Sequence, residues 1–406
     1  MLIVVLLLAQ IVSWFVWRRR LSSPRYRKII TAVFIVFNAA WLATLLYWQR
    51  DREFSSFFLS AAARPAIAWQ TLHALLILPA CAAAWLLAAG LKGLFRLAGR
   101  FSRRPGPAGA PAGPADPGRR DFLKTAANAG FFGLAGFCGF AAVRQYFGPA
   151  VRRLTLTVPS LPRALDGFKL AQLSDIHIGL WSTVRELDLA MEAAASEKPD
   201  LAVITGDLVD RNPNNAYLFK EPFERHLKKV PLGVHAVLGN HDHFADPARI
   251  ARILREIGLN MLVDRRCSLP DLPLSLVGLD DRFRGFIAGS RHPDDDPDIL
   301  DFSLVKGPEK REGDYQILLN HRPEGVRQAM AAGFNLYLAG HTHGGQYSVP
   351  GTEHRLNLAA LFYKYTAGLY PVLNGYINVS CGLAAVGVPF RLISWPEINL
   401  ITLRRA

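Results

Sequence analysis

The sequence predicts an α/β fold with two β-sheets flanked by helices, preceded by an N-terminal region of transmembrane helices. Three observations lead to this prediction. From Val151 onward, short β-rich runs alternate with amphipathic helical segments. Five of these runs end in Asp, Asn or His residues. Long apolar runs and the basic excess occur only in the first 150 residues.

The distribution of charge separates the chain into two regions. Its 406 residues carry a formal net charge of +14. Residues 1–150 contain 18 Lys or Arg but only 4 Asp or Glu, whereas the remaining residues contain 29 of each kind. Basic residues beside apolar segments are typical of membrane loops. A nucleic-acid-binding domain would carry its own basic patch, so we expect no nucleic-acid partner.

Four apolar runs define the N-terminal region. They are Leu2–Trp17, Ile29–Trp48, Ala66–Leu91 and Ala126–Val143. A membrane-spanning helix needs about 20 residues, so residues 1–100 are expected to hold about three transmembrane helices and residues 126–146 a fourth. The first run is short, and a cleaved signal or an interfacial helix is its alternative. Residues 101–125 form a Pro/Gly-rich linker.

The loops between the apolar runs predict the orientation of the chain. The first and third loops are strongly basic and the second is nearly balanced, which favours a cytoplasmic location for the first and third. The C-terminal domain would then lie outside the cytoplasm. The pair Arg119-Arg120, followed by Asp121-Phe122-Leu123, resembles a twin-arginine export signal, although ordinary basic residues before a helix are the alternative. We therefore expect a multi-pass cell-membrane protein with an extracytoplasmic domain.

Residues 150–406 form the second predicted domain. The expected strands are Leu154–Val158, Phe168–Leu173, Leu201–Thr205, Val234–Leu238, Leu274–Val277, Tyr315–Leu319, Leu336–Leu338, Tyr376–Val379 and Ile398–Leu403. The expected helices include Val184–Ser196, Pro247–Ile257 and Glu324–Ala332.

Side chains suited to metal binding follow five of the expected strands. They are Asp175, His177, Asp207, Asn240, His241, Asp242, His321, His341 and His343. In α/β folds, sites are assembled at the C-terminal ends of the strands. Carboxylate and imidazole ligands without thiolates suit Mn, Fe or Zn. A single carboxylate such as that of Asp207 can bridge two such ions.

These blocks resemble the calcineurin-like metallophosphoesterases, whose pattern is DxH, GD, GNH[D/E], a later His, and GHxH. The segments ILLNHRPE and AGHTHGGQYSVPG look similar to a bacterial membrane-associated branch of that family. The resemblance covers about residues 150–406 and implies a calcineurin-like two-sheet sandwich. One departure is Ser380-Cys381-Gly382-Leu383, where relatives often carry an Arg.

The resemblance also implies a role for each matching residue. The first metal would be bound by Asp175, His177 and His343, with Asp207 bridging. The second would be bound by Asn240, His321 and His341. His241 would stabilise the phosphoryl oxygens and protonate the leaving group, and Asp242 would hold His241 in its charged form. The two divalent ions, Mn first among Mn, Fe and Zn, would activate the attacking hydroxide.

The leading functional interpretation is a membrane-anchored phosphohydrolase that cleaves phosphate mono- or diesters, on an envelope or lipid-linked substrate. One alternative is a pyrophosphatase acting on a nucleotide-linked lipid A precursor, which is cytoplasmic and so conflicts with the expected topology. Another is a metal-binding sensor or scaffold without turnover. A transporter with a regulatory domain is disfavoured, because the apolar runs contain few polar residues.

Several other features remain open. Cys267 and Cys381 could form a disulfide in an exported domain, or stay as separate thiols. The stretch Leu361–Tyr365 could contact lipid or substrate, or simply pack. The acidic run Asp294–Asp298 reads as a solvated loop. Histidines without a ligand context are expected to be surface or packing residues: His226, His235, His243, His292 and His354.

Overall fold

The computed structural model describes residues 23–50, 147–179, 182–269, 271–281, 299–348, 356–386 and 393–406, together with residues 10, 11, 14, 15, 18, 140, 144, 352 and 391. The chain divides into two compact units. The first comprises residues 1–47 and 61–140, and the second comprises residues 48–60 and 141–406. Each unit is described by itself.

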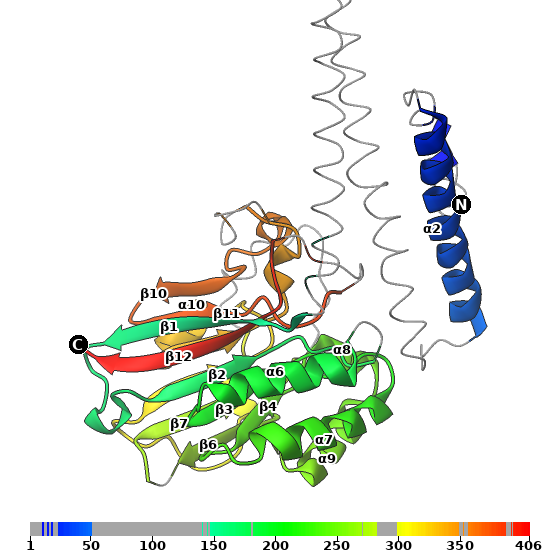
Figure 1. The fold of residues 1–406 in the computed structure, drawn as a ribbon. Helices are drawn as coiled ribbons and strands as arrows, with labels where there is room; N and C mark the ends of the chain where they lie inside the picture. Colours follow the sequence, from blue (N-terminus) through cyan, green and yellow to red (C-terminus); the bar gives the residue numbers. More distant parts are fainter. Residues whose placement is uncertain are drawn as a thin grey trace, which may run out of the picture. The chain divides into compact units, whose positions relative to one another are not determined.

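The described part of the first unit is dominated by one helix, α2 (Pro24–Arg50), which Figure 1 draws in blue. It covers the second apolar run, and Pro24 occupies its first position, where the missing N–H is tolerated. Within the described residues, no helix combines the length and the apolar character that crossing a bilayer requires. The predicted helices over residues 66–91 and 126–146 and the linker over residues 101–125 lie outside the described residues, apart from residues 140 and 144.

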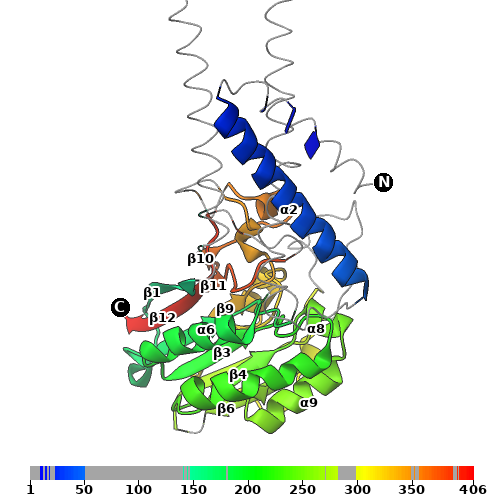
Figure 2. The same ribbon diagram turned by 45° about the vertical axis from the view of Figure 1, so that its right-hand side comes forward.

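The second unit contains two six-stranded sheets (Figures 1 and 2). The first sheet has the order β1-β12-β2-β3-β4-β5. Its strands are β1 (Ala150–Val158), β2 (Lys169–Leu173), β3 (Leu201–Thr205), β4 (Val234–Val237), β5 (Asn260–Met261) and β12 (Glu397–Arg405). The second sheet has the order β10-β11-β9-β8-β7-β6. Its strands are β6 (Arg265–Leu269), β7 (Leu274–Gly278), β8 (Tyr315–Leu319), β9 (Leu336–Ala339), β10 (Gly368–Val372) and β11 (Gly375–Val379).

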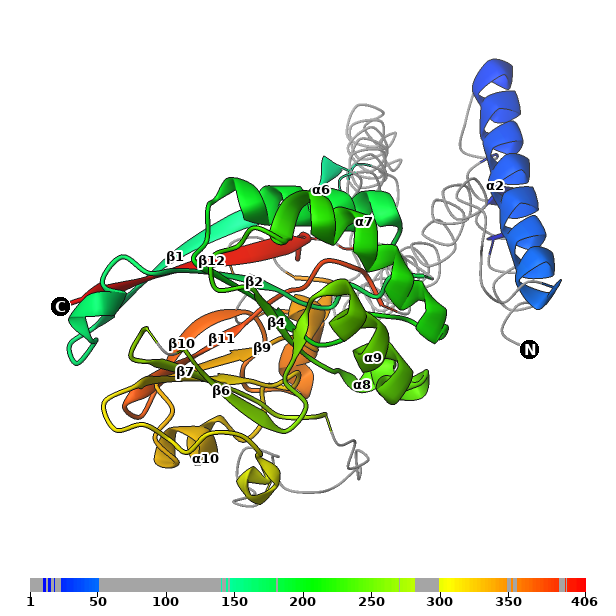
Figure 3. The same ribbon diagram turned by 90° about the horizontal axis from the view of Figure 1, so that it is seen from below.

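Alternation along the strands builds three hydrophobic layers. On β3, Leu201 and Val203 face the layer between the two sheets, whereas Ala202 and Ile204 face the helices. The helices α6 (Val184–Ser196) and α9 (Pro247–Ile257) cover this outer face, as Figure 3 shows. The short helix α10 (Val326–Ala331) packs on the outer face of the second sheet. The unit is therefore a sheet sandwich flanked by helices.

Parallel pairing brings the C-terminal ends of several strands to one edge of each sheet. In the first sheet β2, β3 and β4 are parallel, and in the second β7, β8, β9 and β11 are parallel. A buried polar side chain ties the sheets together near these ends. Gln172 on β2 donates to the Ala339 carbonyl of β9 (2.9 Å) and accepts from Asn378 of β11 (2.8 Å). The loops after both sets of strands are thereby held at fixed separation.

The predicted two-sheet fold of residues 150–406 is confirmed. Every predicted strand is present within a few residues, and α6 and α9 have the predicted bounds. The sequence reading missed β5, β6 and β10, all of which pair on only one side or sit next to an edge. It also missed α8 (Asn240–Phe244) and the run η4 (Pro213–Phe219), α7 (Lys220–Pro222) and η5 (Phe223–Leu227). The remaining short turns are η3 (Arg163–Leu165), η7 (Phe302–Leu304), η8 (His343–Gly345) and η9 (Leu358–Leu361).

Cys267 and Cys381 are both free thiols, so no disulfide joins them. Cys267 lies on β6 at medium exposure, and Cys381 is buried next to β11. The expectation of separate thiols is confirmed.

Candidate metal centre

The structure brings all seven predicted metal ligands to the same edge of the sandwich. Each sits just beyond the C-terminal end of a strand: β2, β3 and β4 in the first sheet, and β8 and β9 in the second. The ligands are Asp175, His177, Asp207, Asn240, His321, His341 and His343. Six are buried and His341 is partly exposed. Polar groups removed from water in this way must be paired or bind ions.

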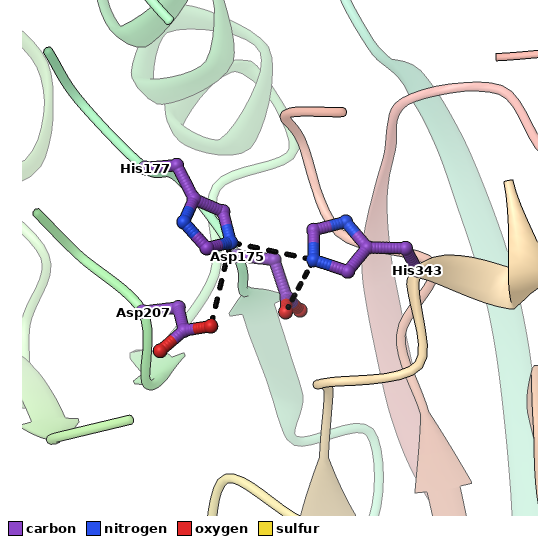
Figure 4. Close-up of side chains that lie close together, drawn as sticks. All are labelled: Asp175, His177, Asp207 and His343. Carbon is purple, nitrogen blue, oxygen red and sulfur yellow. Dashed lines mark hydrogen bonds and ion pairs between the residues drawn. The ribbon is translucent and has the colours of Figure 1, made fainter. Parts of the chain in front are cut away.

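Four of these side chains form a first group, shown in Figure 4. The ligand atoms of Asp175, His177, Asp207 and His343 all lie within 4.8 Å of one another. His177 Nε2 lies 3.3 Å from His343 Nε2 and 3.4 Å from Asp207 Oδ2. His343 Nε2 lies 3.3 Å from Asp175 Oδ1. Two atoms bound at about 2.1 Å to one tetrahedral ion are about 3.4 Å apart, so this spacing fits a metal.

A second group shares Asp207 with the first. It consists of Asp207, His321 and His341. His321 Nε2 lies 3.1 Å from Asp207 Oδ2 and 3.2 Å from His341 Nδ1. Asn240 Oδ1 is buried and has no hydrogen-bond partner among the described residues, which is the state expected of an oxygen that binds an ion. Asp207 therefore stands where two ions would meet.

Backbone carbonyls orient two of the imidazoles toward the site. His321 Nδ1 is 2.8 Å from the Thr205 carbonyl, and His343 Nδ1 is 2.9 Å from the Ala384 carbonyl. A carbonyl only accepts, so each Nδ1 carries a proton and Nε2 is the nitrogen left for a metal, in His321 after its second proton is released. This is the arrangement that a metal-binding histidine requires.

The backbone of the ligand loops is strained. Five ligands have φ between 46° and 69°, in the left-handed region that non-glycine residues rarely adopt: Asp175, His177, Asp207, His341 and His343. Each such residue costs about 1–3 kcal/mol, and clusters of them are typical of functional sites. The strained backbone of these five ligands therefore lowers the stability of the folded protein at the candidate metal centre.

Glycines beside the ligands make their close approach possible. A Cβ on Gly340 would lie 2.0 Å from Ser174 Oγ and 2.3 Å from Asp175 Oδ2. A Cβ on Gly206 would lie 2.5 Å from His321 Nδ1. Neither contact is tolerable, so the glycines of the GD and GHxH blocks are required by the packing of the ligands themselves.

The charged side chains of the two ligand groups shift one another's pKa values in the absence of a metal. Burial by itself would raise the pKa of Asp207, but His321 and His177 hold it well below the usual value. Burial would lower the pKa of His321, but Asp207 raises it to about 10. Burial lowers the pKa of His177 to about 4, and burial together with neighbouring cations lowers that of His343 well below its usual value. One proton on His321 thus balances Asp207, while the other imidazoles keep their lone pairs free.

His241 lies beside the first group and outside the two sets of predicted ligands. Its ring meets that of His177 edge-on, with centroids 4.5 Å apart, and its backbone N–H donates to Asp207 Oδ1 (2.8 Å). Its Nδ1 is 3.2 Å from Asp210 Oδ1. Burial alone would lower the pKa of His241, but the hydrogen bond to Asp210 raises it. The contact with Asp210 thus favours the charged form of the imidazole, whose ring packs against that of His177.

The carboxylate that contacts the His241 imidazole is that of Asp210 and not that of the predicted Asp242. Asp242 accepts hydrogen bonds from the backbone N–H groups of Gly239 (2.9 Å), Val209 (2.9 Å) and Leu208 (3.2 Å). As the third residue of α8, its side chain turns back toward the start of the helix, away from His241. Its role is to join the loops after β3 and β4. The Asp three residues after Asp207 takes the predicted role, and the spacing GDLVD could have revealed it.

Two further residues reach the second group and were missed from sequence. Arg322 donates through Nε to Asp281 (2.9 Å), and its Nη1 lies 2.9 Å from His341 Nε2. Tyr363 places its hydroxyl 3.0 Å from the same Nε2. Both side chains stand on the outer side of His341 and fix the plane of its ring.

A third missed residue, Arg391, is fully buried behind the first group. Its guanidinium donates to the carbonyls of Ala384, His343 and Ser394. Its Nη2 also lies 3.0 Å from His343 Nδ1, but both atoms are donors to the Ala384 carbonyl, so this is a contact without a hydrogen bond. Arg391 therefore holds the backbone that orients His343.

The histidines predicted to be structural have ordinary partners where they are described. His226 contacts Asp188 (3.0 Å), His243 contacts Asp280 (2.8 Å), and His235 lies on β4 with Nε2 3.1 Å from the Leu232 carbonyl. His292, His354 and the acidic run 294–298 lie outside the described residues.

Comparison with known proteins agrees with this geometry. A family model described as calcineurin-like phosphoesterase matches residues 168–345. The uncharacterized metallophosphoesterase YkuE of Bacillus subtilis is 31% identical over 299 residues, which cover 70% of this chain and 97% of YkuE. The chain belongs to the calcineurin-like phosphoesterase family. It is thus a metal-dependent phosphoesterase, and the predicted family is confirmed.

Other relatives extend the comparison. An uncharacterized metallophosphoesterase of Aquifex aeolicus is 31% identical over 256 residues, covering 63% of this chain and 91% of the relative. A Danio rerio protein named transmembrane protein with metallophosphoesterase domain is 31% identical over 267 residues, covering 64% of this chain and 58% of that protein. Members of the family thus include a protein that is named for a transmembrane part.

Proposed function

We propose that this phosphoesterase is a membrane-anchored hydrolase of phosphate mono- or diesters that works with two divalent metal ions. The observation that carries the proposal is the position of Asp207. Its carboxylate belongs to both groups of ligands, and Oδ2 lies within 3.4 Å of His177 on one side and 3.1 Å of His321 on the other. A carboxylate between two histidine-rich groups is suited to neutralise and hold two cations.

The donor set fits such ions. Asp175, His177 and His343 would hold one ion, Asn240, His321 and His341 the other, and Asp207 both. When bound, two divalent ions polarise the phosphoryl group and lower the pKa of a water molecule. Imidazole and carboxylate donors without thiolates favour Mn, Fe or Zn, and we propose Mn.

His241 serves the reaction without binding an ion. Its side chain is about a quarter exposed, so a substrate can reach it, and its charge is supported by Asp210. A protonated imidazole at this position stabilises phosphoryl oxygens and gives its proton to the leaving alkoxide. Asp210 keeps the proton on the imidazole until that step.

The sequence supports a membrane location for the chain and, through it, a substrate in or near the membrane. The apolar runs and basic loops of residues 1–150 favour a multi-pass anchor with the phosphoesterase domain outside the cytoplasm. The Danio rerio relative is named as a transmembrane protein. An anchored enzyme meets lipid-linked or envelope phosphate esters at high local concentration.

Two other functions are less well supported. An extracytoplasmic domain would not meet the cytoplasmic nucleotide-linked lipid A precursor, which disfavours the pyrophosphatase. A sensor without turnover has no need for a histidine such as His241 held by a carboxylate beside the ligand groups, so the His241–Asp210 contact supports turnover.

The test uses the full-length protein in detergent, loaded with Mn²⁺. We would assay bis-p-nitrophenyl phosphate and p-nitrophenyl phosphate with the wild type, Asp207→Asn and His241→Ala. Asp271→Asn, in an exposed turn far from the ligands, and His226→Ala are the matched controls. We expect metal-dependent turnover that the two site variants lose and the two controls keep. Turnover that survives in Asp207→Asn would contradict the shared carboxylate.

A further inference from the structure

Exposed apolar side chains lie on two loops that follow strands at the edge that carries the metal ligands. Phe244 ends α8, after β4, and is 63% exposed. Leu356, Leu358, Leu361 and Phe362 follow β9, and Leu361 is 75% exposed. We name these five residues the apolar rim. Exposed apolar groups that cluster at one place mark contact with a protein partner or with a membrane.

The rim is joined directly to the metal centre. The Phe244 ring packs against that of His241, with centroids 5.4 Å apart. The short helix η9 (Leu358–Leu361) packs on Gly345 of the GHxH loop, where a Cβ would lie 2.7 Å from the Ala359 backbone nitrogen. Tyr363, next in sequence to the rim, contacts His341. A molecule that covers the rim is therefore next to the ligands.

Hydrogen bonds hold one side of the segment Asn357–Thr366 against the domain, and the apolar side chains of the rim project from the other side. Asn357 accepts from the Ala360 N–H (2.9 Å) and donates to Thr366 Oγ1 (2.8 Å). Thr342, between the two histidines of the GHxH block, donates to the Thr366 carbonyl (2.6 Å). Within the stretch Leu361–Tyr365, Tyr365 is buried in the domain, whereas Leu361 and Phe362 are exposed.

The chain enters this unit at the same edge. Ala150 of β1 pairs with Glu397 at the start of β12, and β12 runs antiparallel to β2. The start of β1 therefore lies at the end of β2 that leads to Asp175. Arg144 donates to the Gly148 carbonyl (2.9 Å), and its guanidinium lies 6.0 Å from the Trp395 ring, just before β12.

This point of entry limits the distance to the last apolar run. The run over residues 126–143 ends seven residues before β1 begins. Seven residues span at most about 25 Å. A bilayer that holds the run must lie within that reach of the start of β1. This tether favours lipid over a protein as the partner of the rim.

We propose that the apolar rim docks on the surface of a lipid bilayer and that the metal centre acts on a phosphate ester carried by a lipid. This inference rests on the proposed membrane-anchored hydrolase and names its substrate class. Transfer of leucine and phenylalanine side chains from water into the interfacial layer of a bilayer lowers the free energy of the system. The rim then sets the ligands at the level of the lipid headgroups, where a lipid-linked phosphate lies.

Tryptophan fluorescence in lipid nanodiscs tests the docking. The full-length protein carries Leu361→Trp in the rim or Leu373→Trp as the matched control. Leu373 is 65% exposed and lies in the turn between β10 and β11, at the opposite edge. Each variant is placed in nanodiscs of phosphatidylcholine and phosphatidylglycerol, with and without bromine on the acyl chains.

We expect brominated lipid to quench the added fluorescence of Leu361→Trp at least twofold more than that of Leu373→Trp. Equal quenching of the two variants would overturn the docking. Leu361→Trp emission that shifts to the blue in both kinds of nanodisc without bromine quenching would also overturn it, because a second copy or another protein then covers the rim.

Hydrolysis of bis-p-nitrophenyl phosphate by the same samples separates the two proposals. This soluble ester does not need the rim, so Leu361→Trp should turn it over at the wild-type rate. Quenching without turnover in any sample supports the docking and overturns the proposed hydrolase. Turnover without selective quenching supports the hydrolase and overturns the docking.

Discussion

Replacing Asp210 by Asn tests how the protein keeps His241 charged. Asp210 is nearly buried, and its Oδ1 lies 3.2 Å from His241 Nδ1. The amide of Asn keeps the size of the side chain and one acceptor oxygen but removes the negative charge. The imidazolium then loses the carboxylate that raises its pKa.

The size of the effect follows from the kind of hydrogen bond that is lost. A bond to a charged group contributes about 1.5–3 kcal/mol and a neutral one about 1 kcal/mol, so the difference is about 0.5–2 kcal/mol. Since about 1.4 kcal/mol corresponds to a factor of ten, kcat/KM should fall about 2- to 30-fold. His241 must be protonated to act as the acid. Activity is therefore lost as the pH rises through its pKa, and a lower pKa moves the alkaline limb to lower pH.

The assay is the pH profile of kcat/KM for bis-p-nitrophenyl phosphate with Mn²⁺-loaded full-length protein. Asp242→Asn is the control, because Asp242 accepts only backbone N–H groups in this region and does not touch His241. That variant should melt at lower temperature but keep the position of the alkaline limb. An alkaline limb that moves in Asp242→Asn and stays in place in Asp210→Asn would refute the assignment.

Three further predictions concern the ligands. Gly340→Ala should displace Asp175 and lower the bound metal, measured by plasma mass spectrometry, by about one ion per chain. The control Gly313→Ala should keep both ions, because its Cβ would meet nothing within 4 Å; its positive φ (83°) strains only its own turn. Because His321 has a pKa of about 10 in the metal-free protein, Mn²⁺ binding at pH 8 should release about one proton per chain and weaken as the pH falls; calorimetry in buffers of different ionisation enthalpy would contradict this by showing no release. Arg391→Met should lower the melting temperature by about 5–10 °C, through loss of about 3 kcal/mol of hydrogen bonds to buried carbonyls, and an unchanged melting temperature would exclude that role.

Most ligands of the candidate metal centre could be predicted from the sequence because they directly follow strands. A buried strand such as Leu201–Thr205 has a clear apolar pattern, and Asp207 comes two residues after it. Since parallel strands end at one edge, order in the sequence becomes proximity in space. The edge strands β5, β6 and β10 gave no such signal. β6 reads Arg-Arg-Cys-Ser-Leu, and β10 contains Pro371, which only an edge position tolerates.

The residues that orient the ligands were harder to predict. Asp242 lies next to His241 in sequence, but the turn of α8 directs its side chain to the backbone of the neighbouring loop. Arg391 comes 48 residues after His343 and reaches it only because the chain folds back over the GHxH loop. The contacts of Arg391, and those of Asp242 with Leu208 and Val209, depend on three-dimensional packing, and no spacing along the chain encodes them.

The central claim is that Asp207 lies between two metal ions. Crystals of the Mn²⁺-loaded protein, measured at the manganese absorption edge, test it directly through anomalous difference density. We predict two peaks about 3.5–4 Å apart, one on each side of the Asp207 carboxylate, the first near His177 and the second near His321. A single peak, or two peaks of which only one contacts Asp207, would contradict the claim.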